Sequence, residues 1–411
     1  MTNRRKRKSN TKAKIVIASV LVLIEFAIFM SGYFVGVCTT KKNTVNSNVI
    51  TQSNVQESGE SEEEKLVGEI MKDMSISDMI YQMMFVTPEE ITNVCTVVRA
   101  GGATKKALES YPIGGIVYFA QNFEDREQTI EMISKTQEYS KIPLFISVDE
   151  EGGRVTRLGS NSAMGTTKQP PMKEIGDTKD PKKAYEVGKT LGRELNELGF
   201  NVNFAPDADV IINESNKEIG DRSFGNEPEI VAPMVANTVK GLQDNGVSAT
   251  LKHFPGHGST YIDSHTGYSE SKRTLEELRQ SEFLPFKSGI EAGTDFIMIS
   301  HMTLTNATEE KVPSSISKEV ITDMLINELG YNGIIITDSF SMGAITKEYT
   351  AEDAAVKAVN AGVDMILMPS DLTGTHNAIL KAVESGKISK ERIEQSVRKI
   401  ILLKVKKKMI K

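Results

Sequence analysis

The chain has 411 residues, with 49 Lys or Arg against 55 Asp or Glu and a formal charge of −6. This balance, basic only at the very start, argues against nucleic acid as a partner. The two cysteines, Cys38 and Cys95, exclude a disulfide-rich scaffold, while 39% hydrophobic residues at this length allow a large core.

The first 64 residues predict a membrane anchor followed by a tether. Residues 1–14 form a basic head. Residues 15–37 are apolar except for Glu25, and this segment is long enough to span a bilayer as a helix. Positive charge before the span places the head in the cytoplasm. A cleaved signal peptide or lipoprotein signal is the alternative. Residues 38–64 are rich in Ser, Thr, Asn, Gln and Glu, which indicates a solvated linker. We therefore expect a single-pass cell-membrane protein whose domain at 65–411 is extracytoplasmic.

Apolar runs of strand length alternate with amphipathic segments through residues 65–411. The expected strands are 82–86, 115–119, 144–148, 202–205, 247–251, 296–299, 333–337 and 363–368. The expected helices include 181–198, 229–245, 275–292, 318–329 and 351–361. Eight buried strands alternating with helices favour a (β/α)8 barrel. A doubly wound open sheet is the alternative, but we find no glycine-rich phosphate loop after its first strand.

Charged or polar side chains follow six successive runs, at the end where a barrel carries its active site. They are Asp149 to Arg154, Asp207 with Asp209, Lys252 with His253, His301, Asp338 and Asp371. Polar residues that merely terminate strands would explain some of these, but not the repetition on six strands. We therefore expect one polar site at one end of the barrel.

The segment from Lys252 to Gly258 (KHFPGHG), with Asp263 and His265 just after it, holds three of the five histidines. Two glycines and a proline prevent a regular helix here, so the segment indicates a strand end that opens into a shaped loop. A polar surface loop is the alternative. We expect His257 to support the loop and His376, farther along the chain, to be exposed.

Residues of this kind suit glycoside hydrolysis, which needs one group to attack the anomeric carbon and one proton donor for the leaving oxygen. Asp338 is a candidate nucleophile, although an aspartate after a strand can also be a helix N-cap. His265 is a candidate acid/base, because imidazole titrates near neutral pH. Asp263, two residues earlier on an extended loop, can orient the ring.

Five motifs in order resemble family 3 glycoside hydrolases, in particular the single-domain β-N-acetylglucosaminidase branch. They are Asp149 to Arg157 (DEEGGRVTR), Asp221 to Gly225 (DRSFG), Lys252 to Gly258, Asp263 to His265 (DSH) and Thr337 to Met342 (TDSFSM). The likeness runs from about residue 65 to the C-terminus. The Asp-Ser-His loop marks this branch, whereas the β-glucosidase branch lacks it and takes its acid from a second domain.

The resemblance implies a (β/α)8 enzyme, a retaining exo-β-N-acetylglucosaminidase that acts on a carbohydrate substrate. The expected position outside the membrane favours peptidoglycan fragments with a terminal GlcNAc, and chitin-derived oligomers or other GlcNAc-bearing glycans are the alternatives. By position in the motifs, the resemblance makes Asp338 the nucleophile, His265 the acid/base and Asp263 its partner. The residues that would hold the sugar are Asp149, Arg157, Arg222, Lys252 and His253. Ser339 and Phe340 stand where the family often has Asp-Leu, and residues 213–219 lack its common prolines.

Three alternatives remain open. One is a β-glucosidase-type or other β-glycosidase of the same family, and another is a non-catalytic glycan-binding protein. The third is a metal-dependent barrel hydrolase, with His253, His257, His265, His301 and Asp338 as ligands. The resemblance implies no cofactor and no metal, and we expect a monomer.

Overall fold

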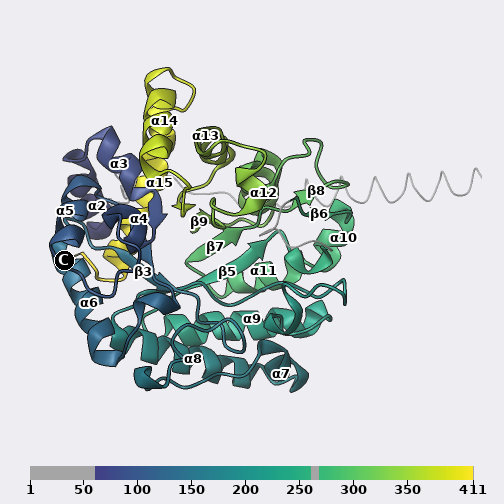
Figure 1. The fold of residues 1–411 in the computed structure, drawn as a ribbon. Coiled ribbons are helices and arrows are strands. Elements are labelled where there is room, and N and C mark those ends of the chain that lie inside the picture. The colour runs from purple at the N-terminus through teal and green to yellow at the C-terminus, as the bar shows by residue number, and fades with distance from the viewer. Residues whose placement is uncertain (1–60, 261–267, 411) are drawn as a thin grey trace, which may run out of the picture. The chain divides into compact units, whose positions relative to one another are not determined.

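The main feature of the fold is a barrel of eight parallel strands, shown in Figure 1. The computed structural model describes residues 61–260 and 268–410. The strands follow the order β10-β1-β2-β3-β4-β5-β7-β9, and a parallel bridge between Ile336 and Met365 joins the last strand to the first. The predicted (β/α)8 barrel is confirmed. The open-sheet alternative is wrong, because its two outer strands meet here.

Seven of the eight predicted runs contain a barrel strand, and the eighth, 247–251, covers only the first part of β5. The strands are β1 (Met84–Val86), β2 (Gly115–Val117), β3 (Phe145–Val148), β4 (Val202–Asn203), β5 (Ser248–Phe254), β7 (Phe296–Ile299), β9 (Ile334–Thr337) and β10 (Ile366–Leu367). All their residues are buried, as expected for strands with packed side chains inside and helices outside. A separate pair, β6 (Glu270–Ser271) and β8 (Thr303–Leu304), lies outside the barrel sheet.

Helices surround the barrel (Figure 1). The first eight are α2 (Glu62–Lys72), α3 (Ile76–Gln82), α4 (Pro88–Thr92), α5 (Gly102–Ser110), α6 (Arg126–Tyr139), α7 (Met172–Asp177), α8 (Pro181–Leu198) and α9 (Pro228–Gln243). The others are α10 (Leu275–Gln280), α11 (Phe283–Glu291), the π-helix η6 (Glu319–Glu328), α12 (Gly343–Thr346), α13 (Ala351–Ala361), α14 (Leu372–Glu384) and α15 (Lys390–Lys406). α15 packs against α2 and α3, so the first and last described helices meet.

Local sequence signals set the bounds of α8, which match the prediction. The Asp180 side chain accepts a hydrogen bond from the Lys182 N–H, and Pro181 occupies the first turn, where its missing N–H costs nothing. Gly199 ends the helix with a φ of 97°, a left-handed conformation that glycine adopts without a steric penalty.

Several predicted boundaries differ from the structure by one to three residues, and two further differences concern whole segments. The expected helix 275–292 is broken into α10 and α11 at Ser281, because Glu282 is buried and pairs with Arg273 through bonds of 3.0 and 3.1 Å. α2 begins at Glu62, within the expected linker. Ser61 caps it by accepting from the Glu64 N–H, and three glutamates in the first turn favour the positive end of the helix dipole.

The prediction that His376 is exposed is wrong. Its ring is buried between α3 and α14, where Nε2 lies 2.9 Å from Ser77 Oγ and the ring stacks on Tyr81 at 4.0 Å.

None of the helices in 61–260 and 268–410 is long and apolar enough to cross a bilayer. The predicted anchor at 15–37 lies outside the described residues.

Candidate active site

A cavity of about 310 Å³ opens at the carboxyl ends of the strands, where barrel enzymes carry their active sites. Its volume is at the small end of the range for ligand pockets, which suits one small ring. Six of the eight predicted site residues line it: Asp149, Arg157, Arg222, Lys252, His253 and Asp338. The other two, Asp263 and His265, lie outside the described residues.

Asp338 reaches the cavity directly after β9. Its backbone N–H donates to the Ile299 carbonyl at 2.8 Å, and its Oδ1 accepts from the Ser339 N–H at 2.7 Å. The alternative of a helix N-cap is wrong, because α12 begins only at Gly343 with Met342 in the N-cap position. The carboxylate is therefore placed at the cavity without any capping role.

Lys252 and Asp149 bring opposite charges to the cavity from β5 and from the loop after β3. Lys252 Nζ lies 2.8 Å from Asp149 Oδ1 and 2.6 Å from Glu151 Oε1. Arg157 Nη2 lies 3.7 Å from Asp149 Oδ2, and its guanidinium stands over the Phe119 ring at 5.8 Å. These contacts hold long, otherwise mobile side chains in one arrangement before any ligand binds.

Glu150 shapes the loop that carries Arg157. Its buried carboxylate accepts from the backbone N–H groups of Arg157, Leu158 and Gly159 at 2.7, 2.9 and 3.0 Å, and from the Thr156 hydroxyl. A single carboxylate thus takes the place of regular secondary structure across this turn.

Arg222 and Glu151 form a buried bidentate pair, with both bonds at 2.9 Å. Burial opposes ionisation of Glu151, but the charges of Arg222 and Lys252 hold the pKa of its carboxyl well below the usual range. Glu151 therefore stays ionised and neutralises the two cations from beneath the cavity.

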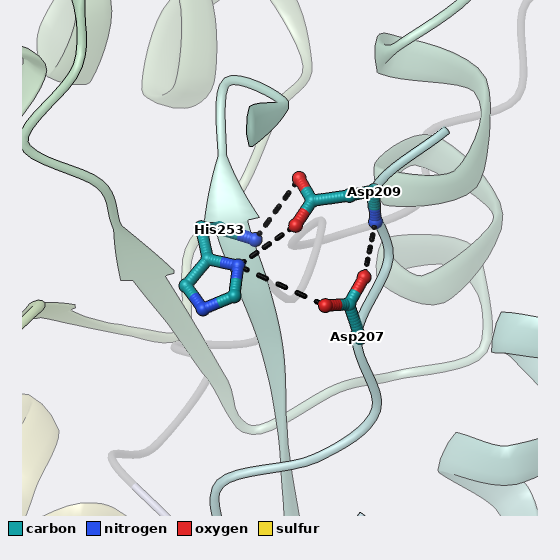
Figure 2. Close-up of side chains that lie close together, drawn as sticks. All are labelled: Asp207, Asp209 and His253. Atoms are coloured by element: carbon teal, nitrogen blue, oxygen red, sulfur yellow. Dashed lines mark hydrogen bonds and ion pairs between the residues drawn. The ribbon is translucent and has the colours of Figure 1, made fainter. Parts of the chain in front are cut away.

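His253 is neutral, and its tautomer is set by two neighbours. Figure 2 shows its Nδ1 facing Asp209, whose Oδ2 lies 2.7 Å away. Its Nε2 lies 3.3 Å from Arg222 Nη2, which can only donate, so Nδ1 carries the hydrogen. Burial, and then the charge of Arg222, lowers the pKa of His253 to about 4. The ring therefore cannot add positive charge to the cavity near neutral pH.

Asp207 is a second, fully buried carboxyl group in the same cluster (Figure 2). Its Oδ1 accepts from the Asp209 N–H at 2.9 Å, whereas its Oδ2 lies 3.6 Å from Arg222 Nη2 and 3.9 Å from His253 Nδ1. Burial, and then the neighbouring charge of Asp209, raises the pKa of Asp207. The protonated acid is thus favoured at this position.

The metal-hydrolase alternative fits these contacts poorly. Among the described residues, the group with ligand atoms close enough for a metal is Asp207, Asp209 and His253, whose atoms lie within 4.8 Å of one another. There the Nδ1–H of His253 already bonds Asp209, and the Arg222 cation stands beside Asp207. His301 is committed elsewhere, with Ser315 Oγ at 2.8 Å and the Ser339 carbonyl at 2.9 Å.

Residues 257–260, which precede Asp263 and His265 in the chain, are tied to the segment after β4. The His257 N–H donates to Asp209 Oδ1 at 2.5 Å, and the Asn216 amide donates to the His257 carbonyl at 2.9 Å. The His257 ring is buried, and its Nδ1 lies 3.1 Å from Thr260 Oγ1. His257 therefore supports this segment from inside, as expected.

Sequence analysis missed several residues of this site, among them the polar Glu218 and Asn216. Glu218 lines the cavity, and Asn216 donates to the His257 carbonyl. Both lie in 213–219, an irregular polar segment with no strand or helix signal. Only contacts with residues distant in the sequence reveal their roles.

Comparison with known proteins places the fold and the motifs in one family. The family "glycosyl hydrolase family 3 N terminal domain" matches residues 75–403. The β-hexosaminidase A of Pseudoalteromonas piscicida is 34% identical over 324 residues, which are 73% of this chain and 54% of that protein. A β-hexosaminidase of Stenotrophomonas maltophilia is 33% identical over 267 residues, which are 64% of this chain and 77% of that protein.

A solved structure shares both fold and sequence. The glycoside hydrolase family 3 β-N-acetylglucosaminidase from Paenibacillus sp. FPU-7 superposes with a TM-score of 0.76 at 36% identity. The match covers 82% of this chain and 63% of that one. This chain thus spans under two thirds of the Paenibacillus protein and about half of the Pseudoalteromonas protein.

Proposed function

Because the chain belongs to glycosyl hydrolase family 3, we propose that it is a retaining exo-β-N-acetylglucosaminidase. The observation that carries this proposal is the gathering of Asp338 and five candidate sugar-binding residues around one small cavity. Carboxylates accept hydroxyl hydrogens, while arginine and lysine donate to sugar oxygens, so this lining can hold one ring in a fixed pose. The names of the related proteins support an N-acetylated sugar.

In the proposed mechanism Asp338 attacks the anomeric carbon as the bond to the leaving oxygen breaks, which gives a covalent glycosyl-enzyme. His265, oriented by Asp263, gives its proton to the leaving oxygen. It then takes a proton from the water that attacks the same carbon from the vacated side. Two displacements at one carbon retain its configuration. Asp149, Arg157, Arg222, Lys252 and His253 hold the ring throughout.

Replacing the proposed nucleophile tests the mechanism. Asp338→Ala should lower the turnover of an aryl β-N-acetylglucosaminide by several powers of ten at an unchanged melting temperature, because it removes the attacking group and no helix cap. Added azide should restore turnover and yield the α-glycosyl azide. Near-normal turnover, or inversion at the anomeric carbon followed by NMR in the wild-type protein, would contradict the assignment.

For the natural substrate we propose peptidoglycan fragments that end in GlcNAc, since residues 1–64 favour a protein tethered outside the cell membrane. The test is product release from GlcNAc–MurNAc peptides, chitobiose and β-glucosides by one enzyme preparation. A preference for the glucoside would instead favour the β-glucosidase alternative. Protease accessibility of residues 65–411 in intact cells, with a cytoplasmic protein as control, tests the location.

A further inference from the structure

His301 follows β7 at the carboxyl end of the barrel, and the proposed mechanism gives it no task. Its side chain is buried, with 1% of the residue exposed. We propose that His301 is a positioning residue, which holds the backbone beside Asp338 so that the attacking carboxylate keeps one orientation. This inference rests on the proposed function, since it takes Asp338 as the nucleophile, and it adds a residue that acts through the nucleophile rather than on the sugar.

Both ring nitrogens of His301 have hydrogen-bond partners, and one partner decides where a hydrogen must be. Nε2 lies 2.9 Å from the carbonyl oxygen of Ser339, which can only accept, so Nε2 carries a hydrogen and donates it. Nδ1 lies 2.8 Å from Ser315 Oγ, in the 3-10 helix η5 (Ser314–Ile316). Ser315 is itself fully buried, so its hydroxyl holds the ring in one orientation. The imidazole is therefore a fixed donor to the Ser339 carbonyl.

Ser339 connects this donor to the nucleophile. Its N–H donates to Asp338 Oδ1 at 2.7 Å, so the orientation of Ser339 sets the position of one carboxylate oxygen. The Asp338 N–H donates to the carbonyl of Ile299, two residues before His301, at 2.8 Å. Residues 299–301 thus hold residues 338–339 at two points, one through the backbone and one through the His301 ring. Without the ring, the Ser339 N–H that orients Asp338 Oδ1 would lose its support.

The two residues after Asp338 are the ones that depart from the family's common Asp-Leu, and His301 contacts both. Besides its bond to the Ser339 carbonyl, its ring lies 5.7 Å from that of the buried Phe340 at 57°, a tilted arrangement that aromatic pairs favour. Both contacts act on the segment that presents the nucleophile. Attack on the anomeric carbon requires the carboxylate to stand in line with the bond that breaks, so this segment is where support from a neighbouring strand affects the rate.

The experiment compares two amides in place of His301. The side-chain nitrogen of glutamine reaches as far as Nε2 and can still donate to the Ser339 carbonyl, whereas that of asparagine reaches only as far as Nδ1. His301→Asn should lower kcat/KM for an aryl β-N-acetylglucosaminide by about 100-fold, the cost of a misplacement of about 1 Å. The inhibition constant of free GlcNAc should stay unchanged, because the residues that hold the sugar are untouched. His301→Gln should recover most of the loss.

A double-mutant cycle with Asp338→Ala separates positioning of the nucleophile from general support of the fold. In Asp338→Ala, azide takes the place of the missing carboxylate and is not held by Ser339, so adding His301→Asn should cost no further azide-dependent turnover. A loss that persists in this background, or equal losses in His301→Gln and His301→Asn, would overturn the role of His301. If His301→Asn does not fold, Ser315→Ala, which removes only the hydroxyl that holds the ring, should show the same pattern with a smaller loss.

His376→Asn is the matched control. His376 is also buried and also has a serine partner, since its Nε2 lies 2.9 Å from Ser77 Oγ, but it lies between α3 and α14 and does not line the cavity. The substitution should lower the melting temperature and leave kcat/KM unchanged. An equal fall of kcat/KM in His376→Asn would contradict a specific role for His301 while leaving the proposed function intact. A wild type that hydrolyses no β-N-acetylglucosaminide would overturn the proposed function itself, and both proposals would fall.

Discussion

At the scale of single residues, the site depends on carboxyl groups with opposite electrostatic surroundings. Glu151 is buried but paired with two cations, so it stays ionised and anchors Arg222 and Lys252. Asp207 is equally buried, yet its nearest carboxyl neighbour, Asp209, carries the same charge, so protonation is favoured there. Burial alone therefore does not decide the charge of a buried acid; the partners do.

Asp207→Asn tests this difference through the pH dependence of stability. Because folding raises the pKa of Asp207, its protonation stabilises the folded protein. This contribution is complete below the pKa of the unfolded chain, about 3.9, and is lost as the pH rises through the pKa of the folded protein. Wild-type stability should thus fall with rising pH in that window, by at most about 1.4 kcal/mol per unit from this group, whereas the amide stays neutral. The melting temperature of Asp207→Asn should therefore rise relative to that of the wild type as the pH increases from 5 to 9.

The exposed Asp73→Asn serves as the control for removal of a carboxylate. A difference between Asp207→Asn and wild type that stays constant over this pH range would show that Asp207 titrates in the folded protein as it does in the unfolded chain.

At the scale of elements, strands were predictable and loops were not. Each barrel strand is a continuous apolar run, because both of its faces are buried, and that pattern is visible without any partner. The residues directly after the strands, such as Asp149 and Asp338, followed from the strand positions, and Lys252 lies within the last residues of β5. The segment 213–222 holds Asn216, Glu218 and Arg222, but only Arg222 was placed at the site, through a family motif. What shapes this segment are bonds to Arg154 and to the His257 carbonyl, which no local pattern encodes.

Gly258→Ala tests how closely η4 (His257–Ser259) must approach the segment after β4. A Cβ at this position would lie 1.9 Å from the Val210 carbonyl oxygen, so one backbone must move. We expect a loss of stability of about 1–3 kcal/mol from overpacking, and a fall in kcat because residues 257–260, which precede His265, shift. Thermal unfolding and steady-state kinetics measure the two effects.

Gly102→Ala is the matched control, because its Cβ would meet no atom within 4 Å and the residue begins α5. It should leave both quantities unchanged or raise stability slightly. A Gly258→Ala protein with wild-type stability and turnover would mean that the two segments can separate without cost.

At the scale of the whole molecule, the two ends of the barrel differ in the charged side chains that they hold. The carboxyl ends of the strands carry the charged cavity, while the last described helix, α15, brings Lys404 to the amino ends of β1 and β3. Lys404 of α15 is fully buried there, with Nζ 2.8 Å from Gln82 Oε1 and 5.0 Å from the centre of the Phe145 ring. The sequence predicted a barrel of eight strands. It did not predict that a lysine side chain would be buried at the amino end of the barrel, because charged residues are rarely buried so completely.

Lys404→Met tests what this lysine does to the molecule as a whole. Burial lowers the pKa of Lys404 to about 7, below the value near 10.4 of an exposed lysine. Between these values the unfolded chain holds a proton that the folded protein has lost, so wild-type stability should rise with pH by at most about 1.4 kcal/mol per unit. Methionine does not titrate, so the stability of Lys404→Met relative to wild type should be highest at or below pH 7 and decline towards pH 9.

Denaturant unfolding across pH 6–9 measures this, with the exposed Lys406→Met of the same helix as control. A pH-independent difference would mean that Lys404 keeps its proton inside the barrel, held there by Gln82 and the Phe145 ring.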